Sequence, residues 1–216
     1  MNTNPNAKVI VCYGDSNTWG DVPNEERRYA SNVRWPGVLQ DILGNDYEVV
    51  NEGLCGRTFK VIEPGKEHRS GIDHLRSILQ TNEPTDLVTI MLGTNDLKNT
   101  FGLSADEIAQ HLRETIEFIQ NEKTGPNESA PQILIICPTP VATPINGDLD
   151  ERMIGAHETS LKLPPLYKKV AEEFGCLYLN AGDFISLENT DGYHLAEKDH
   201  KALGEKVAEI VKQCSM

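Results

Sequence analysis

No stretch of this sequence is apolar enough to cross a membrane. The longest aliphatic run, residues 133–137, is far shorter than the roughly 18 apolar residues that a membrane-spanning helix needs. The start of the chain, MNTNPNAKVIVCY, has a single basic residue, no charged n-region and no small-residue cleavage site, which indicates that there is no signal peptide. We therefore expect a soluble, cytoplasmic protein without a membrane partner.

Cysteine is scarce, and the five cysteines follow no CxxC or Cys/His spacing that would indicate a metal or redox site. Secreted domains of this size tend to pair their cysteines, whereas an odd number leaves one unpaired. A chain of 216 residues buries roughly 70% of its unfolded surface, so it needs neither a disulfide nor a structural metal to fold. We expect buried, reduced thiols, which agrees with a reducing compartment.

Basic residues are outnumbered, because 20 Lys and Arg stand against 33 Asp and Glu and give a net charge of −13. Such a surface repels polyanions, so nucleic acids and anionic membranes are poor candidate partners. Neutral or cationic small molecules fit it better, although the charge inside a pocket depends on the residues that line it. GxGxxG, a Walker lysine and an acidic residue at ribose-binding spacing are also absent, which disfavours a flavodoxin-like nucleotide-binding domain.

Short apolar runs alternate along the chain with longer amphipathic segments. The runs predict strands at residues 8–13, 47–51, 86–92, 132–137 and 176–179. The amphipathic segments predict helices at residues 35–43, 71–81, 104–122, 160–174 and 196–214, the third with a capping box at Ser104 and Glu107. Residues 138–164 hold four prolines and no clear periodicity, which predicts a long, lid-like loop.

The order of these elements defines a fold class. Strands that are apolar throughout are typical of parallel sheets covered on both faces. Five alternating strands and helices predict a three-layer, doubly wound α/β domain with a five-stranded parallel sheet and right-handed crossovers. In such a sheet, functional residues gather at the carboxyl ends of the strands.

The first candidate site follows the first predicted strand, where GDSNTWG occupies residues 14–20. This places Ser16 on the turn at a strand end, a position that suits a nucleophile, and a following helix would direct free N–H groups toward developing negative charge. A Gly-Asp-Ser turn also occurs by chance, so this motif alone leaves an ordinary turn open.

Two more polar turns follow predicted strands at the same sheet edge. Asn95 in GTND (residues 93–96) can donate a side-chain N–H to an oxyanion, or it can form an Asx-turn that only caps the next segment. In NEGLCGRT (residues 51–58), Gly56 can present a backbone N–H.

The last turn, DGYH at residues 191–194, can supply both an acid and a base from one short loop. Asp191 would orient the imidazole of His194 and stabilise its cation, while His194 would take the serine proton. A histidine at a helix start can equally be a cap or a surface residue.

Together these four blocks resemble the GDSL, or SGNH, hydrolases, whose blocks supply Ser, Gly, Asn and His in that order. The match runs from Ser16 to His194, most of the chain. The resemblance implies a flavodoxin-like sheet of order 2-1-3-4-5 in one SGNH hydrolase domain (residues 1–216), and hydrolysis of acyl esters without metal or cofactor. It implies a triad of Ser16, Asp191 and His194.

The same resemblance implies three oxyanion donors: the Ser16 amide, the Gly56 amide and the Asn95 side chain. Gly53 is an alternative to Gly56 that matches the block less well. Asn17 replaces the leucine of the family name, and we expect it to make the pocket floor more polar. Trp19 is a candidate pocket wall, although a tryptophan at this distance from a turn is as often part of the core.

The motifs GDSNTWG, RWPGVL, EGLCGRT and IMLGTND look most like the bacterial arylesterase and acyltransferase branch, which is associated with short acyl groups and oligomers. We therefore expect a homo-oligomer that cleaves short-chain aryl or alkyl esters through an acyl-enzyme, with alcohols as further acyl acceptors. A carbohydrate acetyl esterase is the alternative, because the same blocks serve sugar acetates. A non-catalytic relative is disfavoured by the intact Ser, Asn and Asp/His set.

Overall fold

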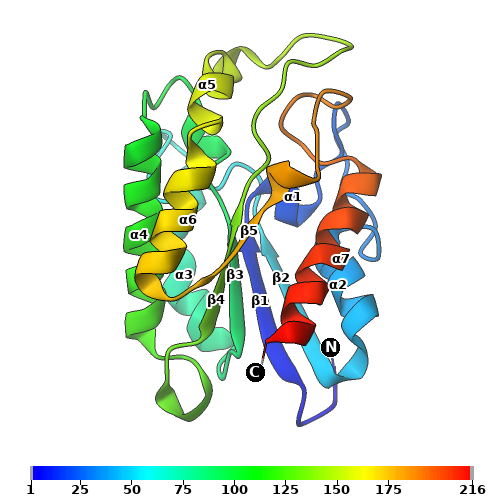
Figure 1. Cartoon of the computed structure of the whole chain (residues 1–216), viewed down its shortest axis with the longest axis vertical. Coiled ribbons are helices and arrows are strands. Elements are labelled where there is room, and N and C mark those ends of the chain that lie inside the picture. Colours follow the sequence, from blue (N-terminus) through cyan, green and yellow to red (C-terminus); the bar gives the residue numbers. More distant parts are fainter. Residues whose placement is uncertain (1, 215–216) are drawn as a thin grey trace.

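The protein, described by a computed structural model over residues 2–214, has five parallel strands between two layers of helices (Figure 1). The strands are β1 (Lys8–Gly14), β2 (Tyr47–Gly53), β3 (Leu87–Met91), β4 (Gln132–Cys137) and β5 (Leu177–Asn180). They lie in the order β2-β1-β3-β4-β5, so the predicted fold class and strand order are confirmed. The single domain predicted for residues 1–216 extends past the described part at Met1 and at residues 215–216.

Helices α3, α4 and α6 cover one face of the sheet, and α2 and α7 cover the other (Figure 1). A separate apolar core fills the space on each side, as expected for strands that are apolar on both faces. The helices are α1 (Ser16–Trp19), α2 (Trp35–Leu43), α3 (Gly71–Thr81), α4 (Ala105–Glu122), α5 (Ala156–Ser160), α6 (Leu163–Phe174) and α7 (Glu197–Gln213).

The register of the neighbouring strands β2, β1 and β3 brings the predicted motifs to one level. Gly14, the last residue of β1, pairs with Gly53 at the end of β2 and with Met91 at the end of β3. The chain therefore leaves these three strands side by side, and the turns that follow begin at the same edge of the sheet.

Two helix starts show how local chemistry sets the boundaries. Ser104 caps α4, and Ser104 and Glu107 form the predicted capping box. The helix predicted at 160–174 begins instead at Leu163, because two prolines follow and a helix tolerates proline only in its first turn. The segment predicted as a loop at 138–164 contains a 3-10 turn (Glu151–Met153) and α5.

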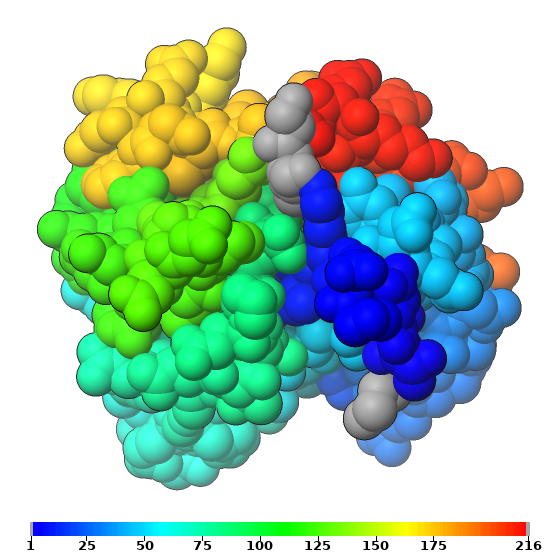
Figure 2. Space-filling model, turned by 90° about the horizontal axis from the view of Figure 1, so that it is seen from below, coloured from blue at the N-terminus to red at the C-terminus, as the bar shows by residue number. Residues whose placement is uncertain are grey.

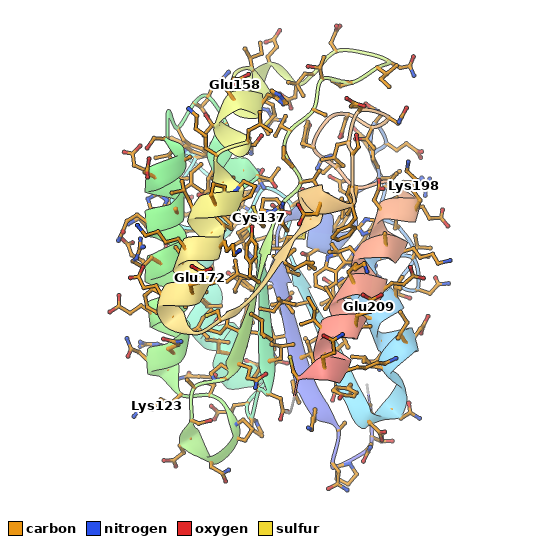
Figure 3. All side chains as sticks on the ribbon, viewed as in Figure 1. Lys123, Cys137, Glu158, Glu172, Lys198 and Glu209 are labelled. Atoms are coloured by element: carbon orange, nitrogen blue, oxygen red, sulfur yellow. The ribbon has the colours of Figure 1, made fainter. Side chains whose placement is uncertain are left out.

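The polar and apolar residues separate as the layered fold requires. Cys137 lies at the centre of the molecule at the end of β4, whereas Glu172 on α6 and Glu209 on α7 lie on the outside (Figure 3). At the amino end of the sheet, the first described residues run across the surface (Figure 2). Asn2 and Asn4 donate hydrogen bonds to the carbonyl of Asn45. Among residues 2–214, no helix has the length and apolarity that crossing a bilayer requires.

Candidate active site

Four segments that follow strand ends or precede α7 meet at one pocket of about 170 Å³. Its lining includes Ser16 after β1, Gly56 after β2, Asn95 after β3 and His194 before α7. The structure thus brings together the four residues that the sequence motifs singled out.

Ser16 begins α1, and this one-turn helix is set by the residue before it. The Asp15 side chain caps α1 by accepting the Asn17 N–H at 2.9 Å. The Oγ atom of Ser16 lies 2.9 Å from Nε2 of His194. Ser16 is 4% exposed, so its hydroxyl faces the pocket from an otherwise buried turn.

Asp191 holds the His194 ring from the opposite side. The Asp191 Oδ2 lies 2.6 Å from Nδ1, and Oδ1 accepts the backbone N–H groups of His194 and Tyr193. Burial opposes ionisation of Asp191, but the hydrogen bond and charge of His194 and the two backbone donors outweigh it and lower the Asp191 pKa. An ionised Asp191 can only accept, so Nδ1 carries the proton and Nε2 is left to accept from Ser16.

A second carboxylate, not anticipated from the sequence, faces the same histidine. The Asp21 Oδ2 lies 3.6 Å from Nε2 of His194, and Asp21 borders the pocket. Burial raises the pKa of Asp21, although the charge of His194 works against the increase. When His194 takes up a proton, this carboxylate stabilises the cation from the pocket side. The GDSNTWG motif ends one residue earlier and carries no signal for this role.

N–H groups that can donate to a ligand are carried by three residues that line the pocket, Ser16, Gly56 and Asn95. Asn95 Nδ2 donates to the carbonyl of Arg57 at 3.1 Å, which fixes the carboxamide and leaves its second N–H for a ligand. Within residues 2–214, no protein acceptor takes the backbone N–H of Gly56 or of Ser16. Gly56 has a φ of 78°, a left-handed conformation that favours glycine. Free N–H groups of this kind are the donors that an oxyanion hole requires.

Two buried charged residues hold these donors in place. Asp96 accepts the Phe59 N–H at 3.1 and 3.2 Å, which ties the turn after β3 to the turn after β2, and burial raises the Asp96 pKa. Arg57 donates to the carbonyls of Gly14 (2.8 Å) and Glu52. Arg57 therefore has a structural role, because its hydrogen-bond partners are backbone carbonyls.

The predicted pocket roles of Asn17 and Trp19 do not agree with the structure, because neither residue lines the pocket. The turn of α1 directs the Asn17 side chain toward the His194 loop, where Nδ2 donates to the Tyr193 carbonyl and Oδ1 accepts the Leu195 N–H, both at 2.9 Å. Trp19 is half-buried and stacks with the Arg28 guanidinium, 4.7 Å from the ring centroid.

The segment at 138–164 borders the pocket, as a lid-like loop would. Asp150, Arg152 and Met153 line it, and the Arg152 guanidinium holds the pKa of Asp150 at about 2 through a 2.5 Å ion pair. The Tyr193 hydroxyl also donates to Asp150 at 3.3 Å. Contacts at the pocket wall thus join this segment to the His194 loop.

Two cations of the pocket were also missed by sequence reasoning, Arg69 and Lys98. Their positions depend on how the loops fold back over the strand ends, and neither belongs to one of the four blocks. The net charge of −13 therefore does not describe the pocket itself, where Arg69 and Lys98 add positive charge. Among residues 2–214, no group of three or more His, Cys, Asp or Glu residues is placed to hold a metal ion.

Comparison with solved structures shows the same fold at substantial sequence identity. The aryl esterase of M. smegmatis is 36% identical with a TM-score of 0.89, covering 96% of this chain and 99% of that one. A carbohydrate acetylesterase from Sinorhizobium meliloti is 33% identical with a TM-score of 0.89, covering 95% of this chain and 99% of that one.

A curated relative and a family match complete the comparison. The acetylxylan esterase of Xylanibacter ruminicola is 27% identical over 94% of this chain, and the chain spans 43% of the length of that protein. Residues 12–202 match the family that carries the four blocks described above. The chain belongs to the GDSL-like Lipase/Acylhydrolase family.

Proposed function

We propose that this protein is a serine hydrolase of carboxylic esters, with Ser16, His194 and Asp191 as its catalytic triad. The observation that carries the proposal is the continuous chain of contacts from Ser16 Oγ to His194 Nε2 (2.9 Å) and from His194 Nδ1 to Asp191 (2.6 Å). Nucleophile, base and orienting acid in this geometry are the requirements for covalent acyl transfer.

In the first step, the Ser16 oxygen attacks the ester carbonyl while His194 takes the hydroxyl proton. The carbonyl oxygen becomes an oxyanion, which the N–H groups of Ser16, Gly56 and Asn95 stabilise. The tetrahedral intermediate collapses as His194 gives its proton to the alcohol that leaves, and an acyl-Ser16 ester remains. Asp191 keeps the imidazole oriented and stabilises its positive charge during the transfer.

In the second step, His194 takes a proton from water, and the resulting oxygen nucleophile attacks the acyl-enzyme. The second tetrahedral intermediate collapses as His194 returns the proton to Ser16 Oγ, which releases a carboxylic acid and free Ser16. An alcohol that occupies the position of the water accepts the acyl group by the same route, so acyl transfer is part of the proposal. Product analysis with added alcohol measures the share of each acceptor.

A short acyl group is the substrate that the pocket supports best. Its volume of about 170 Å³ is smaller than the pockets that hold drug-sized ligands, which start at about 300 Å³. A sugar acetate is the second candidate, because two similar proteins are named as a carbohydrate acetylesterase and an acetylxylan esterase. Both candidates place an acetyl-sized group beside Ser16 and differ in the alcohol.

A substrate panel tests the proposed function. We expect kcat/KM for 4-nitrophenyl esters to be highest for acetate or propionate and to fall with each added methylene group, because longer chains exceed the pocket. Acetylated monosaccharides with one ester each compare the two kinds of alcohol. If none of these esters is hydrolysed faster than in buffer, the proposed function is wrong.

Two features of the wider assignment belong to the same proposal. A cytoplasmic location is supported by the five free cysteines, and burial raises the pKa of Cys12 and of Cys55 to about 12. A homo-oligomer is supported by exposed apolar side chains on the segment at 138–164, where Ile145 is 64% and Ile154 is 62% exposed. Light scattering of the purified protein measures the oligomeric state.

A further inference from the structure

The pocket contains two positive side chains that have no counter-ion. Lys98 is only 8% exposed and Arg69 is half-buried, and both line the pocket beside the oxyanion donors. Among residues 2–214, no carboxylate lies within 4.0 Å of either cationic group. A buried charge without a partner costs free energy, so such a charge is commonly retained for a ligand.

The neighbouring charges show why Lys98 is left without a partner. Arg152 is paired with Asp150, and Lys66 is paired with Glu63. Burial lowers the pKa of Lys98, and the charge of Arg152 lowers it further, with a smaller opposing effect of Glu63. The nearby carboxylates are therefore already engaged.

Arg69 lies directly behind one of the oxyanion donors. A Cβ built on Gly56 would lie 2.8 Å from the Arg69 Nη1, which places the guanidinium against that turn. The Arg69 Nε is buried and has no hydrogen-bond partner within the described residues. An arginine presents a planar fork of donors that suits a carboxylate.

We infer that Lys98 and Arg69 form a subsite for an anionic group on the substrate, so that the preferred ester carries a carboxylate on its acyl or its alcohol part. This inference rests on the proposed ester hydrolysis. The carboxylate supplies the counter-charge that the pocket lacks and forms charge-assisted hydrogen bonds. Asp21, the remaining acid of the pocket outside the Asp150 pair, faces His194 at 3.6 Å and leaves the Lys98 side positive.

Two matched pairs of substrates locate the anionic group. For the alcohol part, 4-acetoxybenzoate is compared with the neutral 4-acetoxybenzamide, and for the acyl part, monoethyl succinate is compared with ethyl butyrate. In at least one pair we expect the anionic ester to have a kcat/KM about tenfold higher, the usual effect of one hydrogen bond to a charged group. Equal values in both pairs would overturn the inference.

The same measurements on Lys98→Met assign the effect to the pocket. We expect the ratio of anionic to neutral kcat/KM to fall by about tenfold, and Lys98→Arg to restore it in part. Lys168→Met removes the same charge from the exposed face of α6 and should leave the ratio unchanged. A ratio that is the same in Lys98→Met as in the unmodified protein contradicts the subsite.

Binding separates this inference from the proposed function. Calorimetry measures the affinity of the Ser16→Ala protein for succinate and for 4-hydroxybenzoate, so the subsite is tested without turnover. We expect one of these anions to bind Ser16→Ala at least about tenfold more tightly than it binds the Ser16→Ala/Lys98→Met double variant. If no ester is hydrolysed but this difference is found, the hydrolase proposal fails and the anion subsite stands. If neutral esters are hydrolysed but neither anion shows the difference, the subsite fails alone.

Discussion

The side-chain carbonyl of Asn17 accepts the backbone N–H of Leu195 at 2.9 Å, the residue directly after His194. The side-chain NH2 group of Asn17 also donates to the backbone carbonyl of Tyr193, the residue directly before His194. One buried carboxamide therefore fixes the peptide groups on both sides of the histidine. Because Asn17 follows Ser16, it couples the position of the base to that of the nucleophile.

Replacing Asn17 by leucine, the residue of the family name, should reduce kcat more than it changes KM. The buried Leu195 N–H loses its partner, at a cost of about 1–3 kcal/mol, the part-buried Tyr193 carbonyl loses its own, and the His194 ring is no longer held at Ser16. Steady-state kinetics and thermal unfolding measure the two effects. Asn82→Leu is the control, because Asn82 follows the last residue of α3 and its side chain donates to the Ile78 carbonyl within that helix. An unchanged kcat in Asn17→Leu would contradict this positioning role.

Asn95→Ala should lower kcat by about 100- to 1000-fold with little change in KM, because the lost N–H stabilises the oxyanion formed only during the reaction. Asn99→Ala provides the comparison, since its exposed carboxamide donates to the Glu151 carbonyl outside the pocket. Steady-state kinetics on a neutral ester measure kcat and KM for both variants. Similar losses in both variants would argue that the effect is structural.

Gly56→Ala and Gly65→Ala form a second matched pair. Both glycines have a φ near 80°, where an alanine costs about 1–2 kcal/mol, but only Gly56 borders the pocket. A methyl group at Gly56 meets the Arg69 side chain, whereas one at Gly65 meets nothing within 4 Å. We expect comparable losses of stability and a loss of kcat in Gly56→Ala alone. Full activity of Gly56→Ala would contradict the assignment of the Gly56 amide to the oxyanion hole.

Asp15 should make stability fall as pH rises. Burial raises its pKa to about 6, with the Asn17 N–H acting against the increase, so the folded state binds a proton that the unfolded state releases at about pH 4. This contribution is complete below about pH 4 and is lost as pH rises through about 6. Asp15→Asn has no such loss, so its Tm minus that of the unmodified protein should grow between those values. Parallel Tm curves would contradict the raised pKa.

Much of the fold was predictable because β1, β3 and β4 are largely apolar, whereas the helices are amphipathic. The predicted strand at 132–137 and the predicted helices at 35–43 and 71–81 match the structure at both ends. A helix or turn after the Ser16 motif was anticipated, but the bounds of α1 were not, since a single turn has no periodicity to detect. The α6 boundary was misplaced by three residues at a pair of prolines.

The residues of the site also differ in how far the sequence predicts their positions. Ser16, Asn95 and His194 stand directly after strands or before a helix, so their meeting follows from the topology. Asp21 and Lys98 enter the pocket through loop paths that only tertiary packing determines. Asn17 is the instructive error, because a polar residue beside a nucleophile is as well suited to holding the base as to facing the substrate.

Ser16→Ala tests the central claim most directly, measured as hydrolysis of 4-nitrophenyl acetate and as labelling by a fluorophosphonate probe. We expect one label per chain on Ser16 and turnover in the unmodified protein, and neither in Ser16→Ala, because the proposed mechanism forms the acyl-enzyme on the Ser16 oxygen. Ser77→Ala, at an exposed serine of α3, should behave like the unmodified protein. Full hydrolytic activity in Ser16→Ala would contradict the account.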